Sequence, residues 1–340
     1  LGLSLASCGF LGHQASICIE NTSVSGKLKD NELWRGEITL TGDVWVPPGV
    51  TLRITPGTTI FVDPKADDQH GGVNPNKVEI IIEGSLVAVG TPTRPIKITS
   101  IPGKTKRFNT WYGLVFRNAD EQSRLKYVQI EHAEIGVSLI DSSILIQACT
   151  IQNCFKAAIS CEGVSAPTIQ DCVLIGNKRC IGGIEIHDDS QPRILNNVIE
   201  GFTHHGGILI DGRSKVLIKG NEIKNNHHGI RGGHLAEAIV MENVIKGNTK
   251  FGITMWDNLH IVLRKNIVTD NGRSGVSVHD TAVLIAANGA NRIMNNRHYD
   301  LANYTPFTID ATGNYWGIGD PEVIKHRVRG LVRFEPFLVR

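Results

Sequence analysis

The chain has 340 residues and nearly balanced charges, with 35 Lys and Arg against 33 Asp and Glu and a formal net charge of +2. This balance excludes the strongly basic surface on which nucleic-acid binding depends, so we expect no nucleic-acid partner. Hydrophobic residues make up 41% of the chain but aromatic residues only 6%, so the core must be mainly aliphatic, and no apolar run is long enough for a transmembrane helix.

The first residues resemble the export signal of bacterial lipoproteins. Leu5-Ala6-Ser7-Cys8 follows a short apolar stretch and is similar to the lipobox of that family. The resemblance implies that residues 1–7 end a signal peptide and that Cys8 carries a lipid anchor, which would hold an exported protein on a membrane of the cell envelope. Gly9, in place of Asp, implies the outer membrane, with the protein facing the periplasm or the cell surface. The alternative is an ordinary apolar N-terminus in which Cys8 is a thiol or part of a disulfide.

Residues 8–35 are expected to form a linker and an N-terminal cap, because regular strand patterns begin only near residue 36. Short alternating apolar segments then follow one another, such as Val44-Trp-Val, Val78-Glu-Ile-Ile-Ile and Pro95-Ile-Lys-Ile. Alternation of this kind is typical of strands with one buried face.

Two columns of residues recur with one period of 22 to 25 residues. In the first column a small residue precedes a short apolar alternation, at Gly113, Gly136, Ala158, Gly183, Gly207, Gly229, Gly252 and Gly275. The second column consists of Cys149, Cys172, Asn197, Asn221, Asn243, Asn266, Asn291 and Asn314. A repeat of this length accommodates three short strands and three turns, and each repeat can pair in parallel with the next at about 4.8 Å. We therefore predict an all-β fold, a single-stranded right-handed parallel β-helix of about 12 coils over residues 36–317.

The Asn column is expected to form an internal ladder, in which each amide donates to the next and satisfies backbone groups at a turn. Cys149 and Cys172 continue this column upstream, and we favour buried thiols there, although a stacked Cα separation of about 4.8 Å would allow a disulfide. Residues 318–340 are expected to cap the downstream end, with Phe334, Phe337 and Leu338 plugging the core.

Several motifs resemble bacterial parallel β-helix repeat proteins. They are Trp111-Tyr-Gly-Leu, the Asn-x-Ile coils, Gly313-Asn-Tyr-Trp-Gly and the phrases Pro47-Pro-Gly-Val-Thr-Leu and Pro56-Gly-Thr. The resemblance runs from residue 36 to the C-terminus and implies the fold. Members of this family include polysaccharide lyases, hydrolases, alginate epimerases and periplasmic copper-maturation proteins, so the resemblance implies no single activity.

Reactive side chains recur just after the first column, where a strand leaves for a turn. Four residues after the small residue stand Glu162, His187, Asp211, Gly233, Trp256 and His279, and one position further stand Asp188, His234, Asp257 and Asp280. Trp stacks on sugar rings, while acids and imidazoles accept hydroxyl bonds or transfer protons. We therefore predict a lateral groove for a polysaccharide or surface glycan, bound by Trp256, His187, Asp188, Asp211 and His234. The alternative is that these are ordinary turn residues.

Asp257, Asp280 and His279 are the candidate catalytic residues. Asp257 and Asp280 fall on adjacent coils, about 5 Å apart at Cα, which is close to the carboxyl spacing of retaining glycosidases. His187-Asp188 and His279-Asp280 resemble the second half of the Asp-Pro-His-Asp box of alginate epimerases, although the Asp-Pro half is absent in both. No complete catalytic set is present, so a glycosidase, a lyase, an epimerase and a groove without catalysis all stay open.

His205 and His227 occupy one column on adjacent coils and form a candidate metal pair, unless they are solvated turn histidines. No motif requires a cofactor. The leading hypothesis is an exported, lipid-anchored β-helix protein that presents a groove to a glycan. The alternatives are a non-catalytic scaffold for an envelope protein, a carbohydrate-active enzyme and a periplasmic metal-handling accessory protein.

Overall fold

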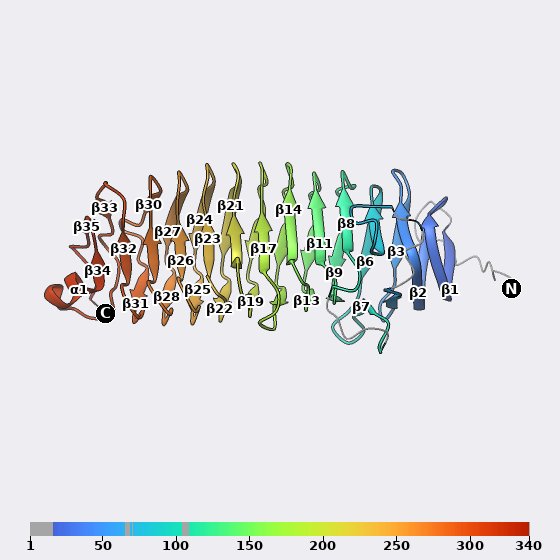
Figure 1. The fold of residues 1–340 in the computed structure, drawn as a ribbon, viewed down its shortest axis with the longest axis horizontal. Helices are drawn as coiled ribbons and strands as arrows, with labels where there is room; N and C mark the ends of the chain where they lie inside the picture. Colours follow the sequence, from blue (N-terminus) through green and yellow to red (C-terminus); the bar gives the residue numbers. More distant parts are fainter. Residues whose placement is uncertain (1–15, 65–68, 70, 104–108, 340) are drawn as a thin grey trace. The chain divides into compact units, whose positions relative to one another are not determined.

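The computed structural model describes residues 16–64, 69, 71–103 and 109–339, so the candidate lipidation residue Cys8 lies outside the described residues. The chain is a single-stranded right-handed parallel β-helix of about 13 turns, which confirms the predicted fold class (Figure 1). It divides into two units, residues 1–160 with 165–168 and residues 161–164 with 169–340. The boundaries fall within strands β14 (Ala157–Glu162) and β15 (Thr168–Gln170). No helix in the described ranges is long and apolar enough to cross a membrane.

The first unit begins with two long strands, β1 (Ile17–Lys27) and β2 (Glu32–Val46), which pair in parallel. Three columns of parallel strands then start from successive parts of β2. The first column contains β5 (Glu79–Ile82), β8 (Gly113–Arg117) and β11 (Ile135–Ile140); the second contains β3 (Thr51–Ile54), β6 (Ser85–Val89), β9 (Arg124–Lys126) and β12 (Leu145–Gln147); the third contains β4 (Thr59–Val62), β7 (Ile96–Ser100), β10 (Val128–Glu131) and β13 (Thr150–Gln152).

Strand β1 lies inside residues 8–35, where the sequence predicts a linker and a cap. Its pairing with β2 starts at Ile17, so regular coil structure begins upstream of residue 36. The sequence gives little sign of this strand, because most positions of ICIENTSVSGK are polar or small.

The second unit repeats the same three columns (Figure 1). The first contains β17 (Gly182–Ile186), β20 (Gly206–Ile210), β23 (Ile230–Gly232), β26 (Ile253–Met255), β29 (Val276–Val278), β32 (Leu301–Asn303) and β34 (Val328–Arg329); the second contains β18 (Arg193–Leu195), β21 (Lys215–Lys219), β24 (Glu237–Met241), β27 (His260–Arg264) and β30 (Val283–Ile285); the third contains β16 (Val173–Ile175), β19 (Val198–Glu200), β22 (Glu222–Lys224), β25 (Val244–Lys246), β28 (Ile267–Thr269) and β31 (Arg292–Met294). Strands β33 (Ile309–Asp310) and β35 (Val332–Arg333) form a separate pair.

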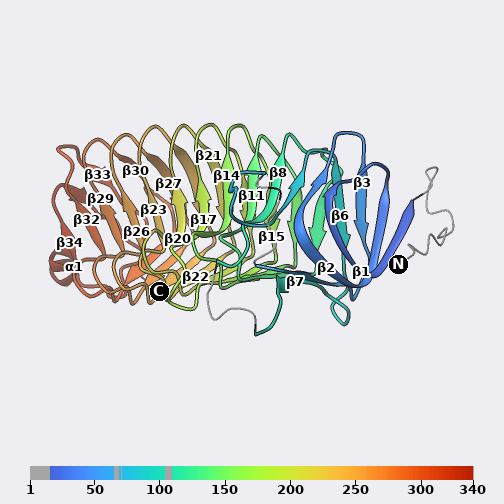
Figure 2. The ribbon, with the colours of Figure 1, turned by 45° about the vertical axis from the view of Figure 1, so that its right-hand side comes forward.

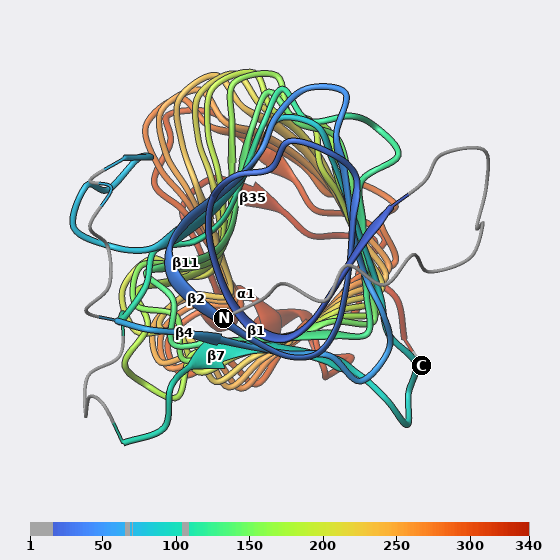
Figure 3. The ribbon, with the colours of Figure 1, turned by 90° about the vertical axis from the view of Figure 1, so that its right-hand side faces the viewer.

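The core of the second unit is a stack of aliphatic side chains, one from each coil. Figure 3, viewed along the stack, shows these coils lying one behind another around a common interior. In the first column the register aligns Ile208, Ile230, Ile253, Val276 and Leu301, all with no exposed surface. Burial of each such side chain stabilises the fold by about 1.5–3 kcal/mol. A single coil cannot bury its apolar face alone, so this stabilisation comes from stacking the coils.

The predicted Asn ladder is present. From Asn197 to Asn291, each amide nitrogen donates to the side-chain oxygen of the next Asn, over distances of 2.8–3.0 Å, and the ladder ends at Asn314. Cys149 and Cys172 are buried, and each thiol donates to the carbonyl two residues earlier, at 3.3 and 3.2 Å.

A second ladder, which the sequence did not predict, runs through Asn226, Asn248, Asn271 and Asn296. It ends at Asp300, whose carboxylate accepts from the backbone and side-chain nitrogens of Asn296 and pairs with Arg327. This partly buried ion pair connects the C-terminal segment to the second ladder.

The C-terminal segment differs from the predicted plug. Helix α1 (Pro321–Arg327) buries Ile324, and β34 and β35 continue the strand stacking. Phe334 and Phe337 are partly buried, but Leu338 is 43% exposed. The tail hydrogen-bonds to residues 313 and 314 as a further layer, and none of the side chains of residues 331–339 is fully buried.

Candidate functional site

One sheet of the second unit has a covered outer face, which we call the site face. It is the outward side of β17, β20, β23, β26, β29, β32 and β34 (Figure 2). Its outward positions are in register: Glu185, Leu209, Arg231, Thr254, Ser277, Ala302 and Arg329.

Burial distinguishes this face from the neighbouring sheet. Leu209 on the site face is 9% exposed and Ser277 is fully buried, although alternation places both on the outer side. At outward positions of the second column, Ile239 is 48% exposed and Ile285 46%. Side chains from the flanking turns therefore cover the site face, whereas the second column is open.

The predicted turn column consists of residues with left-handed backbone. The φ angles are 58° at Asp188, 54° at His234, 53° at Asp257 and 55° at Asp280. Asp and Gly tolerate this conformation, which accounts for the residue types. The carboxylate of Asp188 accepts from the amide of Gly163 at 2.9 Å, and Asp257 accepts from the amide of His234 at 3.2 Å.

The carboxylate of Asp280 makes the same kind of hydrogen bond, accepting from the backbone amide of Asp257 at 3.3 Å. One oxygen of each carboxylate in the predicted catalytic pair is therefore bound to a turn amide. This geometry favours a turn-stabilising role for Asp257 and Asp280 over acid–base work. Asp211 and His234, predicted to bind glycan, contact each other through Oδ1 and Nδ1.

Trp256 and His279 both fold toward the site face. The Arg231 guanidinium lies 4.9 Å from the centroid of the Trp256 ring, and the indole lies so close to Gly233 that a β-carbon there would meet Nε1 at 2.1 Å. The His279 ring stacks on Tyr304 at 4.7 Å, its Nε2 lies 2.8 Å from Ser277 Oγ, and burial lowers its pKa. The half-buried Trp256 ring and the Arg231 guanidinium therefore form a cation–π pair on the site face.

Glu185 forms the centre of an acid–base cluster. Its carboxylate lies 2.7 Å from His205 Nδ1 and 3.8 Å from His187 Nε2. The side chain folds across Gly182, where a β-carbon would come within 2.3 Å of Oε1. Burial raises the pKa of Glu185, but its interactions with the His187 and His205 imidazoles outweigh burial and lower it to about 2. The Glu185 carboxylate beside it raises the pKa of His187 above its usual 6.5.

This cluster predicts a defined pH dependence. The contribution of Glu185 to stability is present above its ordinary pKa of 4.5 and is lost as the pH falls from there through about 2. The contribution of His187 is present below 6.5 and is lost as the pH rises through its raised pKa. Replacing Glu185 by Gln should lower the pKa of His187, because it removes the largest cause of the rise and leaves burial opposed only by the charges of Asp211 and Glu162. An NMR titration of the His187 ring measures this, and an unchanged pKa would contradict the assignment.

The candidate metal pair is held by other contacts. His205 contacts Glu185, and His227 Nδ1 lies 3.0 Å from the backbone oxygen of His204. Within the part of the chain that the structure describes, no three His, Cys, Asp or Glu side chains are placed to hold a metal ion.

Cationic side chains gather on the downstream half of the site face, where the sequence predicts only Trp256 and turn residues. Burial, together with the positive charges of His227, Arg231, Lys250 and Arg273 nearby, lowers the pKa of His228 to about 3. His228 also stacks on Phe251, with 5.6 Å between centroids. These residues come from three coils at different positions of the repeat, so no sequence motif unites them.

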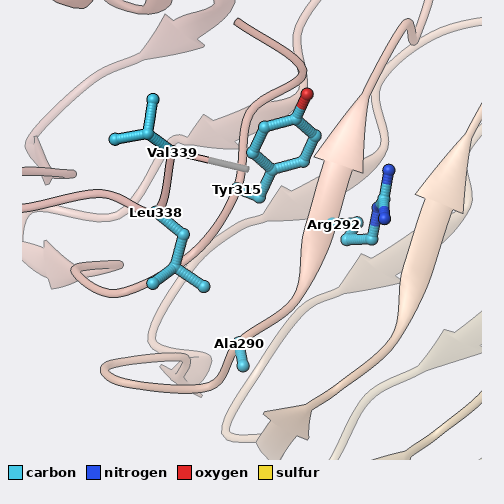
Figure 4. A pocket seen from close by; sticks show the side chains of 5 residues that line it. All are labelled: Ala290, Arg292, Tyr315, Leu338 and Val339. Atoms are coloured by element: carbon cyan, nitrogen blue, oxygen red, sulfur yellow. The ribbon is translucent and has the colours of Figure 1, made fainter. Parts of the chain in front are cut away.

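Among the described residues, two pockets of the second unit bear on the candidate site. One, of about 420 Å³, opens on the site face and is lined by Arg273, Arg329, Phe251, Tyr299, Tyr304, Ser274 and His298. The other, of about 360 Å³, lies where Leu338 and Val339 of the tail face Arg292 and Tyr315 (Figure 4). Only the first adjoins the acid–base and aromatic residues described above.

Comparison with known proteins identifies the fold family. Residues 99–201 and 182–314 match the model of the right handed beta helix region. The chain belongs to this family. No curated protein matches this beta helix protein at the level of sequence.

Two solved structures, both mutant forms of the periplasmic alginate epimerase AlgG, are similar in fold. They are 15% identical to this beta helix protein, with TM-scores of 0.59 and 0.57. The alignments cover 95% and 96% of this chain and 85% of each relative. At this identity the likeness shows a shared fold.

Proposed function

We propose that this protein binds an acidic polysaccharide along the site face. The observation that carries the proposal is a group of four cationic side chains, Arg231, Lys250, Arg273 and Arg329. Among the ion pairs of the described residues, none joins any of the four to an acidic side chain. Cations that lack an internal partner are suited to an external anion, and planar guanidinium groups match carboxylates.

The aromatic side chains on the same face support a sugar as the carrier of the anion. Phe251, Trp256, Tyr299 and Tyr304 all lie beside these cations. Aromatic rings pack against the apolar faces of sugars, while the charges hold the acidic groups. The fold that this chain shares with an alginate epimerase is consistent with a polyuronate ligand.

The Glu185 cluster favours processing of the bound polymer by proton transfer. The His187 imidazole, whose pKa the neighbouring Glu185 carboxylate raises, can hold or release a proton at the surface of the bound sugar. Arg231 stands two strands from Glu185, about 10 Å along the stack, so the cation and the proton-transfer group can act on neighbouring sugar units. Hydrolysis by paired carboxylates is less well supported, because Asp257 and Asp280 are engaged with turn amides.

Export is part of the same proposal. The lipobox-like Leu5-Ala6-Ser7-Cys8 and the periplasmic location named for the similar epimerase both support an exported protein. A lipid on Cys8 would keep it at an envelope membrane, where polysaccharides are made and secreted.

A second candidate function is a scaffold for an envelope protein. The observation that favours it is the row Leu217, Ile239, Val262 and Ile285, which is in register across the open second column. Because Ile239 and Ile285 are about half exposed, this row offers an apolar surface on the side that is not the site face.

Replacing Glu185 by Gln tests processing separately from binding. Wild-type protein incubated with polyuronates in deuterated water should introduce deuterium into the sugar or produce unsaturated chain ends. Glu185→Gln should slow this by about 10²–10⁴-fold, because the proton-transfer centre is lost, while polymer affinity should change little. Glu237→Gln, an exposed pair partner of Lys215, is the control. Binding without any product in the wild type would refute processing, and absence of binding to any acidic polymer would refute the proposal as a whole.

A further inference from the structure

The pocket at the downstream end of the site face contains cations but no acid. Arg273 and Arg329 line it together with three aromatic rings, one Ser and one His, in a volume of about 420 Å³. That volume lies within the range of small-ligand sites, which is about 300–1,000 Å³. The pocket is therefore large enough for a sugar and has the charge to hold an anionic group on it.

Aromatic rings position both guanidinium groups. The Arg329 guanidinium lies 4.8 Å from the Tyr304 centroid and 5.8 Å from that of Tyr299, and the Arg273 guanidinium lies 5.8 Å from the centroid of Phe251. The Tyr304 ring is itself stacked on His279. Stacking orients a guanidinium plane but leaves its N–H groups available to an oxyanion. The arrangement is thus organised before any ligand arrives, which reduces the entropy lost on binding.

The site face ends at this pocket. The outward positions Thr254, Ser277 and Ala302 carry small side chains, and the next position in register is Arg329. Among the described strands, β34 pairs with β32 and none continues the sheet beyond it. Helix α1 leads directly into β34 and packs against it. These three positions are buried beneath side chains from the flanking turns. A polymer that lies along the site face, over those covering side chains, therefore meets Arg329 where the face ends.

We infer that this pocket binds the terminal sugar of an acidic polysaccharide, with the carboxylate of that sugar held by Arg329 and Arg273. The inference rests on the proposed function and adds that the polymer is recognised by its end. When a protein binds only along the length of a polymer, several protein molecules can bind to one polymer molecule. We expect this protein instead to bind once per polymer molecule, at the terminus that the pocket recognises.

Calorimetric titration with oligouronates graded from disaccharide to octasaccharide, and with the long polymer, tests the inference. We expect the stoichiometry to be one protein per chain at every length, and the affinity per chain to stop rising once the oligosaccharide covers the site face. Arg329→Ala should weaken binding of the shortest oligosaccharides by about tenfold or more, since it removes charge-assisted hydrogen bonds. The matched control is Arg292→Ala, which removes a guanidinium stacked 5.0 Å from the Tyr315 ring and away from the site face. Oligosaccharides reduced to the alditol, or unsaturated at the other end, identify which end is held.

The outcomes separate this inference from the proposed function. Several proteins bound per long polymer, together with an Arg329→Ala affinity equal to that of Arg292→Ala, would overturn end recognition while leaving binding along the site face intact. If the wild-type protein binds neither the oligosaccharides nor the long polymer, the proposed function itself is wrong. If short oligosaccharides bind tightly and reduction of their terminal sugar to the alditol abolishes binding, the inference is supported and the pocket holds the reducing end.

Discussion

Replacing Asp300 by Ala should destabilise the second unit by about 3 kcal/mol, the lower end of the cost of breaking a buried ion pair, because Asp300 is buried while Arg327 is partly exposed. The side chain of Asp300 is 1% exposed, and its carboxylate accepts from Arg327 Nε and Nη2 at 3.0 Å each. It also accepts from the backbone and side-chain nitrogens of Asn296, at 3.1 and 2.9 Å. The Ala variant therefore leaves the guanidinium without its carboxylate and the buried backbone nitrogen of Asn296 without the acceptor Asp300 Oδ1. Urea unfolding followed by Trp fluorescence measures the loss, and hydrogen exchange over residues 292–329 shows where it falls.

An exposed pair in the same segment provides the control. Arg333 contacts Asp310 across β33 and β35, but the two side chains are 64% and 35% exposed. Solvent screens such a pair, so Asp310→Ala should cost only a small fraction of the Asp300 effect. Equal losses in the two variants would show that Asp300 does not fasten the C-terminal segment to the second ladder.

Replacing Asn243 by Ala should also remove about 3–5 kcal/mol, because it breaks the first ladder at its middle. The side-chain oxygen of Asn243 accepts from the backbone and side-chain nitrogens of Asn221, both at 2.9 Å. Its nitrogen donates to the backbone oxygens of Ile218 and Met241 and to Asn266 Oδ1, at 2.9–3.0 Å. In the Ala variant the backbone nitrogen of Asn221 loses the acceptor Asn243 Oδ1 and the backbone oxygen of Ile218 loses the donor Asn243 Nδ2. Each buried group that is left unsatisfied costs about 1–3 kcal/mol.

Asn258→Ala, on an exposed turn, is the comparison for Asn243. We expect a loss of under about 1 kcal/mol there, as for most surface substitutions. Thermal and urea midpoints of the two variants measure the difference. A loss below 1 kcal/mol at Asn243 would contradict a structural role for the ladder.

The fold was predictable because stacking converts a sequence period directly into structure. Asn197, Asn221 and Asn243 recur at one place in each repeat, and only one architecture places such a column in the interior. The second ladder was not predictable in the same way. Asn225 and Asn226 are adjacent, yet Asn225 occupies an exposed left-handed turn whereas Asn226 is 1% exposed in the ladder. The same residue type serves both roles, so composition cannot separate them.

The sequence predicts where on the fold the candidate site lies, but not how its side chains are arranged. Its sheet, its turn columns and the residues Trp256 and His187 follow from the repeat. The direction of each side chain does not, and the carboxylates of Asp257 and Asp280 prove to face turn amides. Glu185 escaped notice because it lies inside a strand, where an isolated Glu usually faces solvent. Its role emerges only when the next coil brings His205 against it.

The most direct test of the account is the affinity of a polyuronate for two double variants that lose the same charge. Arg231→Ala/Arg273→Ala removes two guanidiniums from the site face, whereas Arg213→Ala/Arg292→Ala removes two from elsewhere in the same unit. We predict that the first variant binds the polymer about 100-fold more weakly than the wild type, and that the second binds within about threefold of it. Equal affinities of the two variants, whether both weakened or both unchanged, would contradict binding at the site face.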